Sequence, residues 1–205
     1  MISKIVILGA GRSGVGAAIL GKKKGYDVFV SDKKEIDKNL KDFFNGQGIQ
    51  WEAGNHSIET MKSADFIVKS PGISSESNII KNLIHEGKDI ISEIEFAARH
   101  TSAVLIGITG TNGKTTTAML TYRILKDAGL NVGIAGNIGN SFAFQVAKNN
   151  FDYYVLEISS FQLDDIYEFV PHISVITNIT PDHLDRYNYN FDKYIKSKLK
   201  ILRNQ

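Results

Sequence analysis

The stretch that decides the fold is Gly110-Thr111-Asn112-Gly113-Lys114-Thr115-Thr116. It follows the apolar run Val104-Leu105-Ile106-Gly107-Ile108 and precedes a helical pattern that includes Ala118, Met119 and Leu120. A strand, a glycine-containing loop and a helix in this order are the context that a phosphate-binding loop requires. Glycines let backbone amides close around phosphate oxygens, and the N-terminus of the following helix favours negative charge.

Two side chains of this loop can take part in nucleotide chemistry. Lys114 can neutralise terminal phosphates, and the hydroxyl of Thr115 can reach a magnesium ion. The strict pattern Gly-x4-Gly-Lys-Ser/Thr is not met, because Ile108 stands five positions before Gly113. An ordinary strand-to-helix turn is the alternative interpretation. We predict ATP binding by Gly110, Thr111, Asn112, Gly113, Lys114, Thr115 and Thr116.

Composition bounds the class of protein. The chain has 205 residues, of which 42% are hydrophobic and 22% charged, as in ordinary soluble domains. The net charge of +2 does not indicate nucleic acid or an anionic membrane as a partner. The absence of cysteine excludes disulfides and thiolate metal sites, and no apolar run approaches the roughly 18 residues of a membrane span. We expect a monomeric cytoplasmic protein.

Strand and helix patterns alternate along the chain, which predicts an α/β protein with parallel sheets. We expect a Rossmann-like parallel sheet domain over residues 1–92, a connecting helix over residues 93–100, and a P-loop-type parallel α/β ATPase domain over residues 101–205. Within the second domain, helices are predicted over residues 138–148 and 191–202. No completing strand follows, so the second domain is expected to be incomplete.

A second glycine loop lies near the start of the chain. Gly9-Ala10-Gly11-Arg12-Ser13-Gly14 follows an apolar strand, and Asp32 ends the next strand 18 residues after Gly14. This spacing is typical of dinucleotide binding, with glycines at the phosphates and an acid at the ribose hydroxyls. Residues 1–92 alone leave three interpretations open: NAD, another nucleotide diphosphate, or a structural turn.

Polar side chains follow two further apolar strands. Glu157 ends the strand Tyr154-Val155-Leu156-Glu157, where an acid can reach a magnesium ion held by the loop threonine. A solvated carboxylate is the alternative. His183 follows another strand, in Asn178-Ile179-Thr180-Pro181-Asp182-His183, and can ligate a metal or serve a structural role.

One lysine lies on the apolar side of the last predicted helix. At 100° per residue, Phe191, Tyr194, Ile195 and Leu202 form an apolar stripe, and Lys198 lies near its centre. Burial disfavours a charged amine, so Lys198 can be neutral and reactive. The alternative is a lysine that extends from the helix end into solvent.

Together these motifs resemble the Mur ligases, the ATP-dependent amide-forming enzymes of peptidoglycan synthesis. The resemblance covers the whole chain, and the form Gly-Thr-Asn-Gly-Lys-Thr at 110–115 accounts for the departure from the strict loop pattern. Four other strings are most similar to the branch of the family that adds D-glutamate: residues 156–163, 178–186, 136–139 and 70–73.

The resemblance implies a role for each matching residue. The first domain would bind the UDP part of UDP-N-acetylmuramoyl-L-alanine, rather than NAD, through Gly11, Arg12, Ser13, Gly14, Asp32, Lys33, Ser70 and Gly72. Asn137 and Ser159 of the second domain would bind the muramoyl-alanine part of the same substrate, with His183 beside them. Magnesium would be held by Thr115, Glu157, His183 and Lys198, the lysine in carbamylated form. Lys114, His183 and Lys198 would be catalytic.

The reaction that the resemblance implies uses ATP and Mg²⁺ to convert the alanine carboxylate to an acyl phosphate, which the D-glutamate amine attacks. A third, C-terminal domain of the family is expected to be absent from these 205 residues, so we predict no ligase activity from them alone. An NAD-dependent Rossmann oxidoreductase would leave the loop at 110–116 unexplained. A nucleotide-gated binding module would use Lys114 and Glu157 without amide chemistry.

Overall fold

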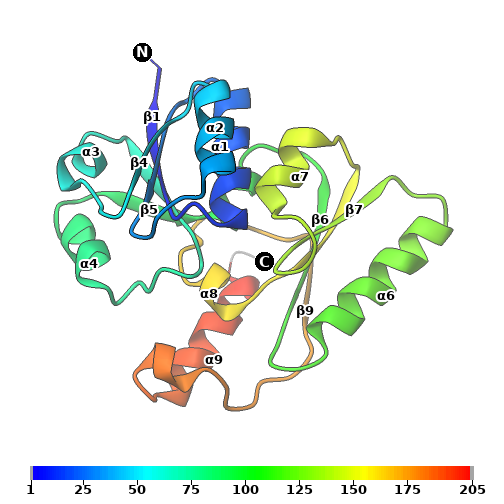
Figure 1. The fold of residues 1–205 in the computed structure, drawn as a ribbon. Helices are drawn as coiled ribbons and strands as arrows, with labels where there is room; N and C mark the ends of the chain where they lie inside the picture. Colours follow the sequence, from blue (N-terminus) through cyan, green and yellow to red (C-terminus); the bar gives the residue numbers. More distant parts are fainter. Residues whose placement is uncertain (1, 204–205) are drawn as a thin grey trace.

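The computed structural model describes residues 2–203 and contains two parallel β-sheets (Figure 1). The first has the order β3-β2-β1-β4-β5, with strands β1 Lys4–Leu8, β2 Asp27–Asp32, β3 Gln50–Ala53, β4 Phe66–Lys69 and β5 Asp89–Ser92. The second has the order β7-β8-β6-β9, with strands β6 Val104–Thr109, β7 Val132–Gly136, β8 Tyr153–Glu157 and β9 Ile173–Ile176. The predicted α/β class with parallel sheets is confirmed.

Helices connect the strands and cover both faces of each sheet, as parallel sheets require. The helices of the first half are α1 Arg12–Lys23, α2 Lys38–Gly46, α3 Ile58–Lys62, α4 Asn78–His85 and α5 Glu93–Ala98. Those of the second half are α6 Lys114–Asp127, α7 Phe142–Lys148, α8 Ser160–Leu163 and α9 Phe191–Leu199, with 3₁₀ turns η1 Leu184–Tyr187 and η2 Lys200–Leu202.

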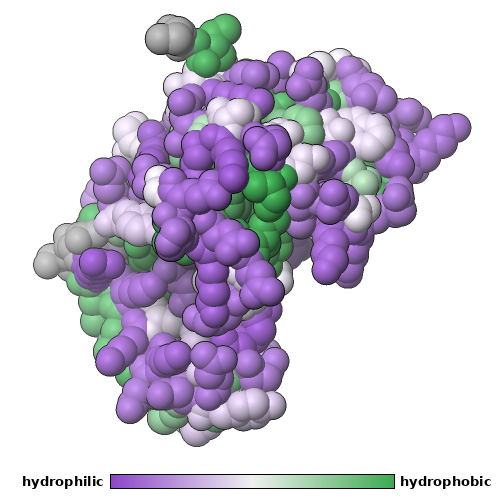
Figure 2. Space-filling model, turned by 90° about the vertical axis from the view of Figure 1, so that its left-hand side faces the viewer, coloured by the Kyte–Doolittle hydropathy of each residue, from purple (hydrophilic) through white to green (hydrophobic). Residues whose placement is uncertain are grey.

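The largest hydrophobic core is shared by the two sheets. Helices α1 and α7 pack against each other between the sheets (Figure 1). Helices α3 and α4 cover the other face of the first sheet, whereas α6 covers the other face of the second. On its other side, α6 leaves Met119, Leu120 and Ile124 at least half exposed. The face in Figure 2, which is the left-hand side of Figure 1, is mostly hydrophilic, with hydrophobic residues in patches.

Helix α5 is more than a connector. It packs against both α1 and α7, and its carboxylates cap neighbouring segments. Glu95 is fully buried and accepts hydrogen bonds from the backbone amides of Tyr167 and Phe169. Glu93 accepts one from the amide of Ala143, in the first turn of α7. The predicted helix at 93–100 therefore exists, as α5, and fixes the two sheets relative to each other.

Two predicted helices differ from the observed ones. The helix predicted over 138–148 begins only at Phe142, because the side chain of Ser141 caps it by accepting from the amide of Phe144. The helix predicted over 191–202 tightens into a 3₁₀ turn at Lys200. This change of pitch buries Ile201 and leaves Leu202 43% exposed, so the predicted place of Leu202 in the apolar stripe is wrong.

No helix among residues 2–203 is long and apolar enough to cross a membrane.

Candidate functional site: two glycine loops at the sheet edges

The loop between β6 and α6 is held in place by the segment that follows β9. The amides of Thr111 and Asn112 donate to the backbone oxygen and to Oδ1 of Asn178, at 2.9 and 3.0 Å. Gly110 has φ +144°, and a Cβ there would lie 1.9 Å from Oγ1 of Thr177. Only glycine fits this position, which sets the path of the loop into α6.

Glu157 joins the polar side chains at the carboxyl ends of the second sheet's strands. The sheet register places it opposite Ile108 of β6 and Gly136 of β7, so its side chain meets residues that follow both strands. Its Oε2 accepts from the hydroxyl of Thr115 at 2.7 Å, and its Oε1 accepts from the amide of Asn137 at 2.7 Å. The structure thus brings together two predicted metal ligands, Thr115 and Glu157, and adds Asn137 to them.

The chemistry of this group fits a hard cation. Glu157 is 1% exposed, and both of its hydrogen-bond partners are neutral. A buried carboxylate normally has a cationic or metal partner. Carboxylate and hydroxyl oxygens suit Mg²⁺, and water or phosphate oxygens usually complete its coordination. Among residues 2–203, no group of three or more acidic or histidine side chains is placed to hold a metal. A magnesium ion at Thr115 and Glu157 would therefore need water or phosphate oxygens as its other ligands.

Lys198 is buried behind the loop, as its position on the apolar stripe predicted. It is 2% exposed, its Nζ donates to the backbone oxygen of Gly110 at 2.6 Å, and it lies 4.7 Å from the centre of the Tyr194 ring. Burial and the nearby charge of Lys114 together lower the pKa of Lys198 to about 8, although the charge of Asp182 opposes them. A neutral amine is therefore readily accessible, and the solvent-extended alternative is wrong.

Lys114 and His183 lie less directly at this centre. The Nζ of Lys114 donates to the backbone oxygen of Thr111 at 2.7 Å, so it folds back over the loop. His183 has φ +49°, is exposed, and pairs with Asp182 at 3.5 Å. Its ring contacts Phe161, and no contact in residues 2–203 joins it to Glu157. The structure therefore does not bring His183 into the Thr115–Glu157 group.

The glycine loop of the first sheet is closed by Asp32. The Oδ2 of Asp32 accepts from the amide of Ala10 at 2.6 Å, and its Oδ1 accepts from the amide of Lys34 at 2.8 Å. A Cβ on Gly14 would lie 1.8 Å from the backbone oxygen of Gly9, so α1 starts tight against the loop. The Oγ of Ser70 lies 3.4 Å from that same oxygen, which brings the β4–α4 segment to the loop.

The remaining residues predicted to bind the UDP substrate lie at two places. Gly11 is the N-cap of α1 and Ser13 lies in the first turn of that helix, whereas Lys33 and Gly72 lie in the loops that follow β2 and β4 at the same edge of the first sheet. Arg12 reaches the second sheet's edge, where its guanidinium donates to the backbone oxygens of Gly139 and Asn137 at 2.7 and 3.3 Å. Ser159 caps α8 and pairs with Gln162. Ligand contact by these residues stays a prediction.

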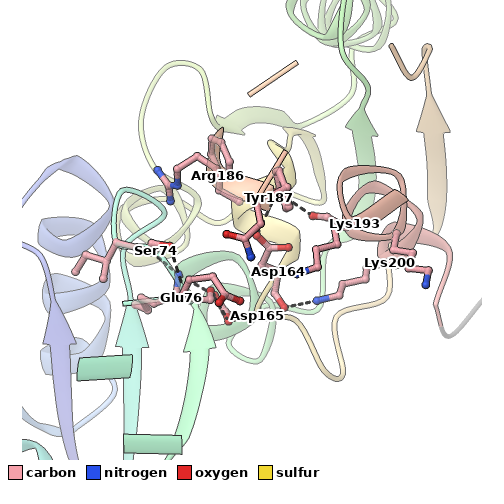
Figure 3. Close-up of a pocket in the computed structure, with 15 residues that line it drawn as sticks. Ser74, Glu76, Asp164, Asp165, Arg186, Tyr187, Lys193 and Lys200 are labelled. Carbon is pink, nitrogen blue, oxygen red and sulfur yellow. Dashed lines mark hydrogen bonds and ion pairs between the residues drawn. The ribbon is translucent and has the colours of Figure 1, made fainter. Parts of the chain in front are cut away.

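A pocket of about 300 Å³ lies between the β4–α4 segment and α8, η1 and α9 (Figure 3). Its wall contains a buried ion pair, in which the Nζ of Lys69 lies 2.9 Å from Oδ2 of Asp165. Arg186 donates to the backbone oxygen of Pro71 at 3.3 Å and stacks over the Phe161 ring. None of the predicted site residues lines this pocket. Its charged side chains come from both halves of the chain, but the pocket does not include either glycine loop.

Sequence reasoning missed several residues that shape the site. Tyr194 donates to or accepts from Oγ1 of Thr111 at 3.0 Å, and Asn178 holds the loop amides. The position of Asn178, two residues after β9, placed it at the ligand edge of the sheet, but did not indicate that it holds the loop amides. No sequence signal indicated the pairing of Lys69 with Asp165, because this pairing depends on how the two halves of the chain pack together.

Comparisons with known proteins agree with this geometry. The description "Mur ligase MurD-like, N-terminal domain" matches residues 3–92, and "Mur ligase middle domain" matches residues 108–205. The chain belongs to the Mur ligase family. The residues between the two matches, 93–107, contain α5 and most of β6.

Relatives of this Mur ligase chain share one name. Proteins named UDP-N-acetylmuramoylalanine–D-glutamate ligase are 56% identical over 204 residues in Bacteroides fragilis and 53% identical over 204 residues in Bacteroides thetaiotaomicron. The alignment covers 100% of this chain and 46% of each relative. The chain therefore spans about half the length of the curated relatives it matches.

Two solved structures share the fold. A UDP-N-acetylmuramate:L-alanyl-gamma-D-glutamyl-meso-diaminopimelate ligase from Neisseria meningitides superposes with TM-score 0.64 at 20% identity, over 99% of this chain and 68% of that one. A UDP-N-acetylmuramate-alanine ligase from Thermotoga maritima gives TM-score 0.59 at 24% identity, over 98% and 47%. At this identity, the likeness concerns the fold alone.

Proposed function

We propose that this Mur ligase chain supplies the UDP-substrate and ATP sites of an enzyme that adds D-glutamate to UDP-N-acetylmuramoyl-L-alanine. The observation that carries the proposal is the meeting of Thr115, Glu157 and Asn137, while Lys198 lies buried against Gly110 of the loop that leads to Thr115. The relatives named for D-glutamate ligation, at 56% identity over the chain, support the choice of substrates.

In this proposal, the residues of the second sheet's edge bind and activate. The amides of the loop at 110–116 and the N-terminus of α6 would bind the phosphates of ATP. Thr115 and Glu157 would hold Mg²⁺, which supplies charge stabilisation during phosphoryl transfer when bound. Lys114 would swing from the oxygen of Thr111 to the terminal phosphate, which needs no backbone movement.

Lys198 would act after carbamylation. Its amine must lose a proton before its lone pair can attack carbon dioxide, and burial favours that neutral form. The resulting carbamate would turn a buried cation into a buried anion next to the loop, and an oxygen ligand suited to a second magnesium ion. His183, which is exposed and contacts Phe161, would face the substrate side of this centre.

Assay of the complete protein tests the proposal. Phosphate release should require ATP, UDP-N-acetylmuramoyl-L-alanine and D-glutamate together, and L-alanine or meso-diaminopimelate should not replace D-glutamate. Activity with another amino acid would redirect the substrate assignment. Tight saturable binding of NADH, measured by fluorescence, would favour an oxidoreductase instead. The 205 residues alone should release no phosphate in response to D-glutamate, and turnover by them would refute that expectation.

The role of Lys198 has its own test in the complete protein. Lys198→Ala should abolish turnover, and short carboxylic acids added to the assay should restore part of it by replacing the carbamate. Lys196→Ala is the matched control, because Lys196 lies on the exposed side of the same helix. Unchanged turnover in Lys198→Ala would return Lys198 to a structural role.

A further inference from the structure

A network of three side chains lies behind Asp32, at the edge of the first sheet. Ser31, which is fully buried, donates its hydroxyl proton to Oε1 of Glu52 at 2.6 Å. The same Ser31 oxygen lies 2.7 Å from Nδ1 of His56. Ser57 adds its backbone amide and its hydroxyl to Glu52. Neither the glycine motif nor any other sequence motif pointed to this network.

The network fixes which nitrogen of His56 carries the proton. Burial raises the pKa of Glu52, but hydrogen bonds from Ser31 and Ser57 outweigh it and leave the pKa below its ordinary value. An ionised Glu52 can only accept, so the proton of Ser31 points to it. The Ser31 oxygen can then offer His56 only a lone pair. The Nδ1 of His56 must therefore be the donor, which leaves Nε2 as an acceptor.

The charge state of His56 agrees with this tautomer. Burial lowers the pKa of His56, although Glu52 and Asp32 raise it, and Lys33 lowers it again. The ring is therefore neutral near pH 7. Among residues 2–203 no hydrogen bond reaches Nε2, and this atom is not one of the buried unpartnered atoms. The ring presents an accessible acceptor of fixed direction.

The position of His56 relates this acceptor to the glycine loop. The β3–α3 segment meets the β2–α2 segment where the amide of Gly54 donates to the oxygen of Lys34 at 3.4 Å. Parallel strands end at one edge, so His56 lies on the same edge as residues 9–14. Both oxygens of Asp32 already accept backbone amides there. Nε2 of His56 accepts no hydrogen bond from any of residues 2–203.

We propose that Nε2 of His56 accepts a hydrogen bond from the uridine of the UDP substrate, and that Ser31 and Glu52 hold the ring for this contact. Uridine offers two kinds of donor, the ribose hydroxyls and the N3–H of uracil. This inference rests on the proposed binding of UDP by the first sheet. It makes His56 a residue that selects the nucleoside, whereas the loop at 9–14 contacts its phosphates.

Calorimetric titration of the 205-residue chain with UDP tests the proposal. In His56→Asn the shorter amide can still donate to Ser31, but the acceptor at the Nε2 position is lost. We expect UDP to bind about 3- to 10-fold more weakly, the usual size of one lost hydrogen bond. His85→Asn, on the exposed last turn of α4, is the matched control and should bind like wild type. Equal melting temperatures show that the fold is kept.

Analogues identify the donor. Each of 2′-deoxy-UDP, 3′-deoxy-UDP and CDP lacks one of the possible donors. Wild type should bind the analogue that lacks the donating group more weakly than UDP, and His56→Asn should bind that analogue and UDP equally well. A lost penalty for a deoxy-UDP indicates a ribose hydroxyl, and a lost penalty for CDP indicates N3–H. UDP affinity unchanged in His56→Asn overturns the inference while leaving UDP binding in place. No saturable binding of UDP by wild type overturns both.

Discussion

The two glycine loops of this chain start from the same local design and end in different chemistry. Each follows a buried parallel strand, opens a helix and contains a glycine that no other residue can replace, Gly14 in one and Gly110 in the other. Around the first loop, Asp32 closes the backbone by accepting two amides. Around the second, Glu157 accepts hydrogen bonds from the side chains of Thr115, in α6, and Asn137, which follows β7.

The difference lies in what the neighbouring strands place at the sheet edge. The first edge offers backbone amides, the carboxylates of Asp32 and Glu52, which already accept hydrogen bonds, and the imidazole of His56, which suits a ligand that is held and recognised. The second edge offers the buried carboxylate of Glu157, the amine of Lys114, and Lys198, which is buried and has a lowered pKa. This set suits phosphoryl transfer, in which negative charge has to be stabilised. A strand–loop–helix pattern therefore predicts phosphate binding, while the partners of the strands decide between holding and reacting.

The largest expected effect separates the cations of the two loops. In the assay that tests the proposed function, Lys114→Ala should lower kcat for phosphate release by roughly 1,000-fold, since preorganised charge at a transferring phosphoryl group is worth about 4 kcal/mol. Arg12→Ala, in the first loop, should change kcat by less than about 5-fold, because Arg12 contacts backbone oxygens of residues 137 and 139. Equal losses in the two variants would contradict the division between the loops.

Substitutions at Gly14 and Gly110 test what the two loops share, which is the need for a glycine. Gly14→Ala should lower the free energy of unfolding by roughly 3 kcal/mol or more, because its Cβ would lie 1.8 Å from the Gly9 oxygen. Gly110→Ala should cost a similar amount, since strain at φ +144° adds to its clash with Thr177. Gly11→Ala is the control, because nothing lies within 4 Å of its Cβ. Urea unfolding measures all three, and a stable Gly14→Ala protein would show that the loop can relax.

The ion pair between the two halves should have a slightly smaller effect. Lys69→Met leaves Asp165 largely buried without its cation, which should reduce the free energy of unfolding by about 3 kcal/mol. The double variant Lys69→Met/Asp165→Asn should recover part of this loss, because it leaves no unpaired charge. Urea unfolding of the single and double variants gives the coupling energy. A coupling near zero would mean that the two halves do not depend on this pair.

The smallest effect concerns Glu93, and it depends on pH. Burial raises the pKa of Glu93 to about 7, although the amide of Ala143, Ser141 and the charge of Arg12 lower it. The folded state thus binds this proton more tightly than the unfolded state, so the stabilisation is complete below about pH 4.5 and is lost as pH rises through about 7. Glu93→Gln should therefore be about 2 kcal/mol more stable than wild type at pH 8 and similar to it at pH 5.

Thermal unfolding between pH 5 and pH 8 measures this difference. Glu59→Gln, at an exposed position in the first turn of α3, is the control and should follow wild type at every pH. Parallel pH profiles for wild type and Glu93→Gln would show that Glu93 ionises freely in the folded protein.

Periodicity and local motifs were sufficient for most of the fold. Continuous apolar runs such as residues 104–108 and 153–157 predicted buried parallel strands, and glycine loops marked where helices begin. The errors occurred where local chemistry or helix pitch departs from the regular pattern. Ser141 caps α7 later than the spacing of Ile138, Phe142 and Val146 suggested, and the 3₁₀ turn at Lys200 exchanges Leu202 for Ile201.

The sequence by itself determined the two glycine loops, the acid at the end of β8, the family, and the place of Lys198 on the apolar side of α9, although only the structure decided that Lys198 is buried. These are local properties, because strand ends, glycine freedom and a 100° helical step depend only on near neighbours. The tertiary structure alone decided that Asn137 joins Glu157, that Lys69 pairs with Asp165, and that Ser31 and Glu52 set the tautomer of His56. Each of these joins distant segments, and their distances follow from sheet register and packing that no local pattern encodes.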